Sequence, residues 1–167
     1  MLRRGFTIVE LTITVVVMAI IMALIVINLS NSQVSARDTT RKGNAETIAR
    51  SLERYYDTGV TGPNGVYPST DLVGNESSYL PDMDLNALND PVDTTPVSEL
   101  VAATNATQTT SGVAPALSSS YIKYVYQPIA SDNTLCTNSA SQTCVKFNLY
   151  YYLESSSTVA KIESAHR

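Results

Sequence analysis

The sequence predicts an α+β fold in which one long N-terminal helix packs on a small antiparallel β-sheet. No proline occurs before Pro63, and apolar residues fill positions 5–29 almost without interruption. Apolar residues then recur at steps of three and four as far as Tyr55, which is the spacing of one helix face. The clear alternating, strand-like segments come late, between residues 121 and 163.

Residues 6–29 form the first half of the predicted helix and are long enough to cross a membrane. At about 1.5 Å per residue, roughly 20 apolar residues span a bilayer. Arg3 and Arg4 precede the run, as the excess of basic residues on the cytoplasmic side of membrane proteins leads one to expect. The run is too long for a secretory signal peptide and lacks a good cleavage site after it. A plain single-pass anchor accounts for length and orientation but leaves Glu10, the one ionisable residue of the run, unexplained.

The second half of the helix, residues 30–57, is amphipathic. Gly43 and the polar stretch 28–33 are the places where such a helix would bend or loosen. Gly59 is a typical stop, so the sequence predicts one helix from about residue 6 to residue 57. We expect its apolar stripe to cover the sheet, and the stripe consists of Ala45, Ile48, Leu52 and Tyr55.

The residues at the start of the run, Arg4-Gly5-Phe6-Thr7-Ile8-Val9-Glu10-Leu11, resemble the leader and mature N-terminus of the type IV pilin superfamily. This superfamily includes type IV pilins and the pseudopilins of type II secretion and competence systems. The resemblance implies that residues 1–5 are a leader peptide, cut off after Gly5 by a prepilin peptidase, and that Phe6 becomes an N-methylated terminus. It also implies that Glu10 meets the Phe6 amino group of a neighbouring subunit, a pairing that fixes the register of packed helices.

The resemblance further implies a structural role without enzymatic activity. The chain is expected to pass once through the cytoplasmic membrane as a precursor and then to join a homo-oligomeric helical filament on the cell surface. An inner-membrane platform and an ATPase would drive assembly, because the chain carries no phosphate-binding glycine loop of its own. Two alternatives stay open, namely a type II secretion or competence pseudopilin and a minor tip pilin with an adhesive head.

Residues 58–167 are expected to form a globular head. Its first part, residues 58–120, is a predicted loop region rich in glycine, proline, serine and threonine, with a short helical turn near 98–103. Its second part, residues 121–163, is the predicted antiparallel sheet. Alternation of apolar residues places the strands at 121–126, 145–153 and 158–163.

Five acidic or amide side chains in the loop region match part of the ligand spacing of a calcium-binding loop. They are Asp82, Asp84, Asn86, Asp90 and Asp93. Ala87 stands where such loops have glycine, and the last position is aspartate rather than glutamate. Some pseudopilins hold calcium in this region, so the resemblance supports calcium as a cofactor. A solvated acidic loop is the alternative.

Cys136 and Cys144 lie in the part of the chain expected outside the cytoplasm, where disulfides form. We therefore expect a disulfide in the connection between the first two strands, with two free thiols as the alternative. The pair has no histidine nearby in the sequence, which makes it poor evidence for zinc.

Charge and composition exclude several classes of function. From residue 58 onward the chain has ten acidic and four basic residues, and such a head repels phosphate backbones. We therefore expect no nucleic-acid binding. His166, the single histidine, is next to the last residue, so no Ser–His–Asp or Cys–His set can be assembled around it. The sequence accordingly predicts no enzyme.

Overall fold

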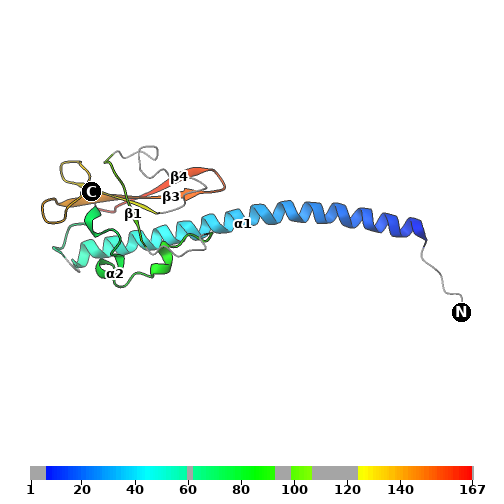
Figure 1. Ribbon diagram of the computed structural model, residues 1–167, viewed down its shortest axis with the longest axis horizontal. Coiled ribbons are helices and arrows are strands. Elements are labelled where there is room, and N and C mark those ends of the chain that lie inside the picture. Colours follow the sequence, from blue (N-terminus) through cyan, green and yellow to red (C-terminus); the bar gives the residue numbers. More distant parts are fainter. Residues whose placement is uncertain (1–6, 60–61, 93–98, 107–123, 167) are drawn as a thin grey trace.

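The computed structural model describes residues 7–59, 62–92, 99–106 and 124–166, apart from the side chains of residues 26–28. Its largest element is α1, Ile8–Thr58, a single helix of 51 residues. At 1.5 Å per residue this helix is about 77 Å long. Its second half lies along the head and its first half projects alone (Figure 1). The prediction of one long helix is confirmed. The predicted cleavage site, Gly5 and Phe6, lies outside the described residues.

Local interactions cap both ends of α1. At the N-terminus, the Thr7 side chain accepts a hydrogen bond from the Glu10 backbone N–H, and the Glu10 side chain accepts one from the Thr7 N–H. At the C-terminus, Gly59 has φ 59° and donates its N–H to the Tyr55 carbonyl at 2.9 Å. A Cβ atom on Gly59 would lie 2.6 Å from the Gly62 carbonyl oxygen, so this left-handed position requires glycine.

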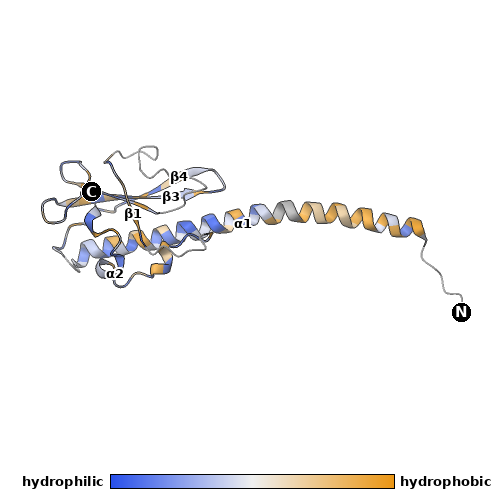
Figure 2. Ribbon diagram, viewed as in Figure 1, coloured by the Kyte–Doolittle hydropathy of each residue, from blue (hydrophilic) through white to orange (hydrophobic). Residues whose placement is uncertain are grey.

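The two halves of α1 lie in opposite environments. In the free half, residues 8–29, every described side chain is exposed, and Figure 2 colours most of this half as hydrophobic. In the docked half, residues 30–58, the predicted apolar stripe is buried against the head, with Ile48 and Leu52 at 0% exposure. The predicted amphipathic second half is therefore confirmed.

The head contains a mixed four-stranded sheet with the strand order β1-β2-β3-β4. Strand β2 pairs antiparallel with β3, and β3 pairs antiparallel with β4, whereas β1 runs parallel to β2. The chain is thus an α+β protein, as predicted. The strands are β1 (Val101–Ala102), β2 (Val125–Ala130), β3 (Cys144–Leu153) and β4 (Thr158–Glu163).

The structure corrects the predicted sheet at its first edge. The sheet is mixed rather than antiparallel, because β1 pairs parallel to β2 through a 3.0 Å hydrogen bond from the Val101 N–H to the Tyr124 carbonyl. Strand β1 also replaces the helical turn expected near residues 98–103. A two-residue strand is too short to show a period of two, and its pairing depends on a partner far along the chain.

The first predicted strand is also displaced. Strand β2 covers residues 125–130, four residues later than expected, and residues 121–123 lie outside the described part. The cause of the error is Pro128, which normally argues against an inner strand. Its carbonyl accepts the Cys136 N–H, on the side away from β3, and β1 pairs with residues 125 and 126 alone. The missing N–H of proline therefore removes no bond to β1 or β3.

Strand β3 carries the core and buries both of its faces. Phe147, Leu149 and Tyr151 alternate along the strand on one face, and they belong to the main core with the stripe of α1. On the other face, Tyr150 packs with Val125 in a smaller cluster. The region predicted as loop closes the core with three short helical elements, η1 (Thr70–Leu72), α2 (Glu76–Tyr79) and η2 (Leu85–Leu88).

Candidate functional site

The free half of α1 is an extended exposed apolar surface. Its bulky aliphatic side chains from Ile8 to Leu29 are 48–79% exposed wherever they are described. By length and composition α1 is able to cross a membrane. Monomeric soluble proteins rarely expose so large a continuous apolar surface, which marks it as an interaction surface for lipid or for other apolar helices.

Glu10 is the charged side chain in the first turn of the free half. Its Oε2 atom accepts hydrogen bonds from the Thr7 N–H at 3.1 Å and from the Thr7 hydroxyl at 3.0 Å. Within the described residues its Oε1 atom has no partner. The carboxylate is therefore held at the N-terminus of α1 with one oxygen available to a further donor. The spacing Thr7-x-x-Glu10 is the sequence signature of this cap, and the sequence-based expectations above missed it.

Five charged side chains join α1 to the head, and we call them the neck cluster: Arg37, Asp38, Arg41, Asp90 and Glu154. Arg41 is fully buried at the centre. Its guanidinium donates to both carboxylate oxygens of Asp90, at 2.6 and 3.2 Å, to Asp38 at 2.9 Å and to Glu154 at 3.2 Å. Arg37 donates to the two oxygens of Glu154 at 2.6 and 2.9 Å. The cluster therefore connects α1 with two separate segments of the head.

Asp38 anchors the β3–β4 turn to α1. Its two carboxylate oxygens accept the backbone N–H groups of Glu154 and Ser155, each at 2.8 Å. Burial favours a higher pKa for the Asp38 carboxyl, but its hydrogen bonds to Ser155, Glu154 and Arg41 outweigh burial and lower that pKa. The hydrogen bond from Arg37 likewise lowers the pKa of Glu154. Both carboxylates are therefore stabilised in the charged form.

Burial of the Arg41 guanidinium disfavours its charged form, yet the hydrogen bonds and charge of Asp90 and the other carboxylates raise the pKa of Arg41. A buried charge of this kind is tolerated because its donors are paired. Periodicity in the sequence carries no signal for the cluster, since Asp90 and Glu154 lie far along the chain from Arg41. Of the five residues, Asp90 alone was predicted to be a site residue, and the predicted role was that of a calcium ligand.

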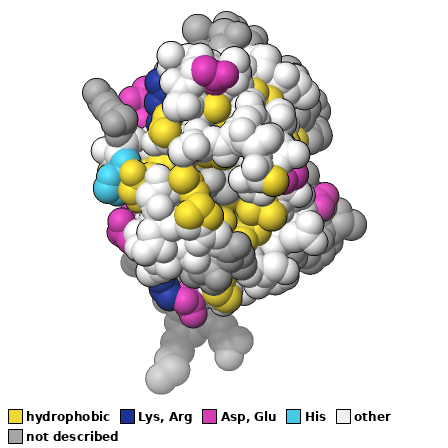
Figure 3. All heavy atoms as spheres, turned by 90° about the vertical axis from the view of Figure 1, so that its left-hand side faces the viewer, with side chains coloured by type: hydrophobic (Ala, Val, Ile, Leu, Met, Phe, Trp, Pro, Cys, Tyr) yellow, Lys and Arg dark blue, Asp and Glu magenta, His cyan; other side chains and the backbone are white. Residues whose placement is uncertain are grey.

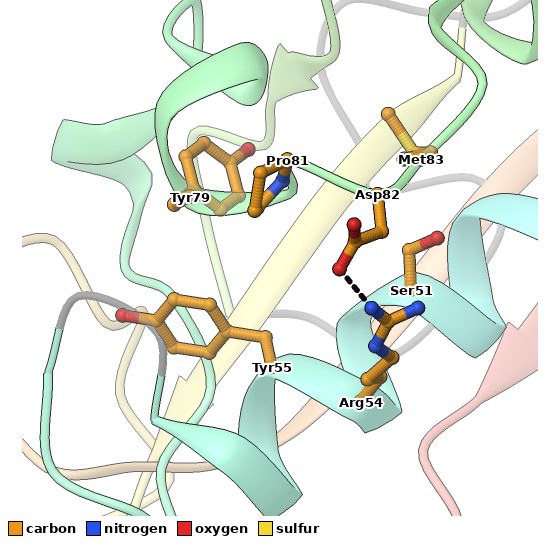
Figure 4. Close-up of a pocket in the computed structure, with 7 residues that line it drawn as sticks. All are labelled: Ser51, Arg54, Tyr55, Tyr79, Pro81, Asp82 and Met83. Carbon is orange, nitrogen blue, oxygen red and sulfur yellow. Dashed lines mark hydrogen bonds and ion pairs between the residues drawn. The ribbon is translucent and has the colours of Figure 1, made fainter.

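The predicted calcium ligands make other contacts. Asp82 forms an ion pair with Arg54 beside a small pocket (Figure 4), and Asp84 accepts the backbone and side-chain N–H groups of Asn86. Asp90 belongs to the neck cluster, and Asp93 lies outside the described residues. No group of three His, Cys, Asp or Glu side chains able to hold a metal occurs in the described part of the chain. Calcium binding thus stays a prediction without support from this geometry.

The end of the head farthest from the free half is closed by a disulfide. Cys136 and Cys144 form the predicted disulfide, and their Cα atoms are 5.6 Å apart. The bonded pair is tied to the segment after α1, because Tyr67 donates its N–H to the Cys144 carbonyl and Thr70 donates its N–H to the Cys136 carbonyl. These contacts fix the β2–β3 connection beside the C-terminus of α1.

A hollow of about 230 Å³ lies between these segments, and we call it the distal hollow. Figure 3 looks onto this end of the molecule and shows hydrophobic side chains gathered around a depression. None of the described residues that line the hollow is charged. Six of them, from α1, the segment after it and the disulfide-closed connection, are Tyr55, Pro63, Val66, Leu72, Ser139 and Ala140.

The C-terminal tail packs on the last turns of α1. The His166 ring stacks on Tyr56, with ring centroids 4.2 Å apart, and its Nε2 lies 3.7 Å from a Glu53 carboxylate oxygen. The Ala165 N–H donates to the other oxygen of Glu53 at 2.8 Å. These contacts give His166 a packing role at the surface of the helix.

Comparisons of the chain with protein-family models, with curated proteins and with solved structures find no match in any of the three. The resemblance of residues 4–11 to prepilins therefore stays an expectation. Function has to be inferred from the residues and their contacts.

Proposed function

We propose that the chain is a type IV pilin-like structural subunit that polymerises through the free half of α1. The observation that supports this most is the continuity of α1, which is exposed and apolar over one half and built into the head over the other. A membrane anchor needs only an apolar run of sufficient length. A filament subunit also needs a stiff joint between its core helix and its head, and the neck cluster around Arg41 meets this need.

The free half is stable in two environments, lipid and a bundle of apolar helices. Burial of one Val, Leu or Ile side chain contributes about 1.5–3 kcal/mol, so a run of exposed aliphatic side chains in water is strongly unfavourable. The precursor would therefore span the cytoplasmic membrane once. The helix would leave lipid only for a bundle of the same helices from other copies.

Glu10 favours the bundle over lipid. A carboxylate in the hydrocarbon region costs about 2.5–3.5 kcal/mol even on the lenient insertion scale. Cleavage after Gly5 would create a cationic amine at Phe6, one residue before the Thr7 cap. The Oε1 atom of Glu10, which has no partner within the described residues, is available to that amine from a neighbouring copy. A desolvated pair of this kind specifies one register between parallel helices.

Three kinds of partner follow from this function. A prepilin peptidase would remove residues 1–5 and methylate Phe6, and an inner-membrane platform with an ATPase would lift subunits out of the membrane. Other copies of the chain would complete the filament. The acidic heads would form its outer surface, because charged residues are stable in water.

Mass spectrometry of sheared surface filaments tests this function. We expect this chain as the dominant protein, with a methylated Phe6 as its first residue. The variant Gly5→Asp should stay at precursor length on a gel and be absent from filaments, whereas Gly43→Ala, a change at a distant glycine, should be processed normally. A wild-type chain that retains Met1 and never enters filaments would refute the proposal. A processed chain found at trace level would support the tip-pilin alternative.

A further inference from the structure

The side chain of Gln142 organises the loop between the two cysteines. Its Oε1 atom accepts hydrogen bonds from the Thr137 N–H at 2.7 Å, from the Thr137 hydroxyl at 3.2 Å and from the Asn138 N–H at 3.2 Å. Its Nε2 atom donates to the Leu135 carbonyl at 3.3 Å. One half-buried side chain therefore binds the backbone on both sides of Cys136.

Gln142 lies two residues before Cys144, so these contacts hold the two ends of residues 136–144, the cysteine loop, beside each other. The Gln142 N–H also donates to the Asn138 carbonyl at 3.0 Å. None of these hydrogen bonds involves a sulfur atom, and each joins residues at most seven positions apart. Because short-range contacts cost little loop-closure entropy, we expect them to form in the reduced chain as well.

Both cysteines are buried in the folded head, at 0% exposure for Cys136 and 1% for Cys144. The segment after α1 packs on them, because the Tyr67 N–H donates to the Cys144 carbonyl at 2.9 Å and the Thr70 N–H donates to the Cys136 carbonyl at 3.0 Å. Thiol–disulfide exchange requires access of the oxidant to a thiolate. We therefore expect the pair to react before this segment docks, when the short-range contacts of the cysteine loop are the ones available to align the thiols.

We propose that Gln142 is a positioning residue for formation of the disulfide between Cys136 and Cys144. It holds the reduced cysteine loop in its closed form, so that the second thiol lies near the first when an oxidant has reacted with one of them. Groups held in this way react as if their concentration were high, because the entropy of bringing them together has already been lost. This role does not depend on filament assembly, since every contact lies within one chain.

The oxidant in this step is another disulfide, such as oxidised glutathione, in the oxidising environment outside the cytoplasm. The thiolate of one cysteine attacks a sulfur of the oxidant, which forms a mixed disulfide and releases one glutathione thiolate. The thiolate of the other cysteine then attacks the sulfur of the first cysteine and releases the second glutathione thiolate. The released thiolates take up the two protons that the cysteines lost, so the chain loses two electrons and the oxidant gains them.

Equilibration with glutathione tests this role in the full chain. The detergent-solubilised protein is incubated at fixed ratios of reduced to oxidised glutathione, starting from both the oxidised and the reduced form, and free thiols are alkylated and counted by mass spectrometry. The result is the effective concentration of one cysteine thiol towards the other. Gln142→Ala should lower it about tenfold, because the reduced loop opens without the hydrogen bonds of this side chain.

Two further variants separate the chemistry of the side chain from its place in the loop. Gln142→Glu keeps an acceptor for the N–H groups of Thr137 and Asn138 and should stay within about threefold of the wild type. Ser141→Ala, a change at the exposed neighbour, should leave the effective concentration unchanged. Equal effective concentrations for the wild type and Gln142→Ala, or equal decreases for Gln142→Ala and Ser141→Ala, would overturn the proposal.

Melting temperatures give a second test that distinguishes positioning from stability alone. Gln142→Ala is measured in the oxidised chain and in a chain with Cys136→Ser and Cys144→Ser, which cannot form the bond. Positioning couples the side chain to the disulfide, so the loss of melting temperature should be larger in the oxidised chain. Equal losses in the two chains would show that Gln142 only stabilises the fold, and would contradict the proposal.

Discussion

The two halves of α1 belong to one helix and have opposite chemistry. The free half exposes every described side chain, whereas the docked half buries Ile48 and Leu52 completely and holds Arg41 in a cluster of carboxylates. The docked half obtains its stability from the head of the same chain. The free half has no such cover in the described structure and must obtain it from lipid or from other chains. The head therefore buries its own apolar residues together with the docked half of α1, whereas the apolar surface of the free half stays uncovered within the described structure.

The largest expected effect comes from removing the central cation of the docked half. Arg41→Ala leaves Asp90 and Asp38 buried without their cation, and loss of one partner of a buried ion pair costs about 3–5 kcal/mol. Thermal unfolding of the full chain in detergent measures this loss of stability. Arg50→Ala is the matched control, because Arg50 is 74% exposed and 4.0 Å from Glu46, and it should change stability by less than about 0.5 kcal/mol. Equal effects would show that the neck cluster contributes no stability.

The same substitution in each half compares them directly. Ile48→Ala removes a fully buried side chain and should destabilise the head by about 3 kcal/mol. Ile20→Ala, at a residue 58% exposed on the free half, should change the unfolding of the detergent-solubilised monomer by less than about 0.5 kcal/mol. A large effect of Ile20→Ala on the monomer would mean that the free half has an intramolecular partner.

Acid should weaken the docked half through the neck cluster. The lowered pKa values of Asp38 and Glu154 mean that the unfolded chain binds protons first as the pH falls. Their contribution to stability is therefore present above the ordinary carboxyl pKa of about 4 and is lost as the pH falls through the lower folded-state values. Melting temperatures between about pH 6 and about pH 3 should fall less steeply for Asp38→Asn than for the wild type. Parallel curves would exclude this role for Asp38.

The smallest expected effect is a gain of stability at Gly43. This residue is exposed on the docked half, and a Cβ atom placed on it meets nothing within 4 Å. Gly43→Ala should therefore stabilise the helix by about 0.5–1 kcal/mol through the lower entropy of the unfolded chain. A decrease in melting temperature would indicate that α1 must bend at this position.

Local patterns in the sequence predicted the elements that depend on local chemistry. The bounds of α1 followed from its apolar run and Gly59, and β3 and β4 followed from alternation, within one residue of the observed ends. The disulfide followed from two cysteines in the part expected outside the cytoplasm. Strand β1 was missed because its stability comes from a partner strand, and β2 was displaced because Pro128 obscured its pattern.

The neck cluster could not be predicted from the sequence for a different reason. Its ion pairs join residues that are 49 and 113 positions apart, and no periodicity connects them. Asp90 was identified as a possible metal ligand because an aspartate that binds arginine and one that binds calcium look the same in a sequence. The free half could be recognised from the sequence because its apolar character is a matter of composition, with Glu10 as the single ionisable exception.

Filament yield from Glu10 variants tests the central proposal most directly. Glu10→Ala should leave membrane insertion intact while the amount of the chain in sheared filaments falls at least about tenfold, because the register between helices loses its ion pair. Glu46→Ala, which removes an exposed carboxylate from the docked half, should leave the yield unchanged. Wild-type filament yield from Glu10→Ala would contradict the account.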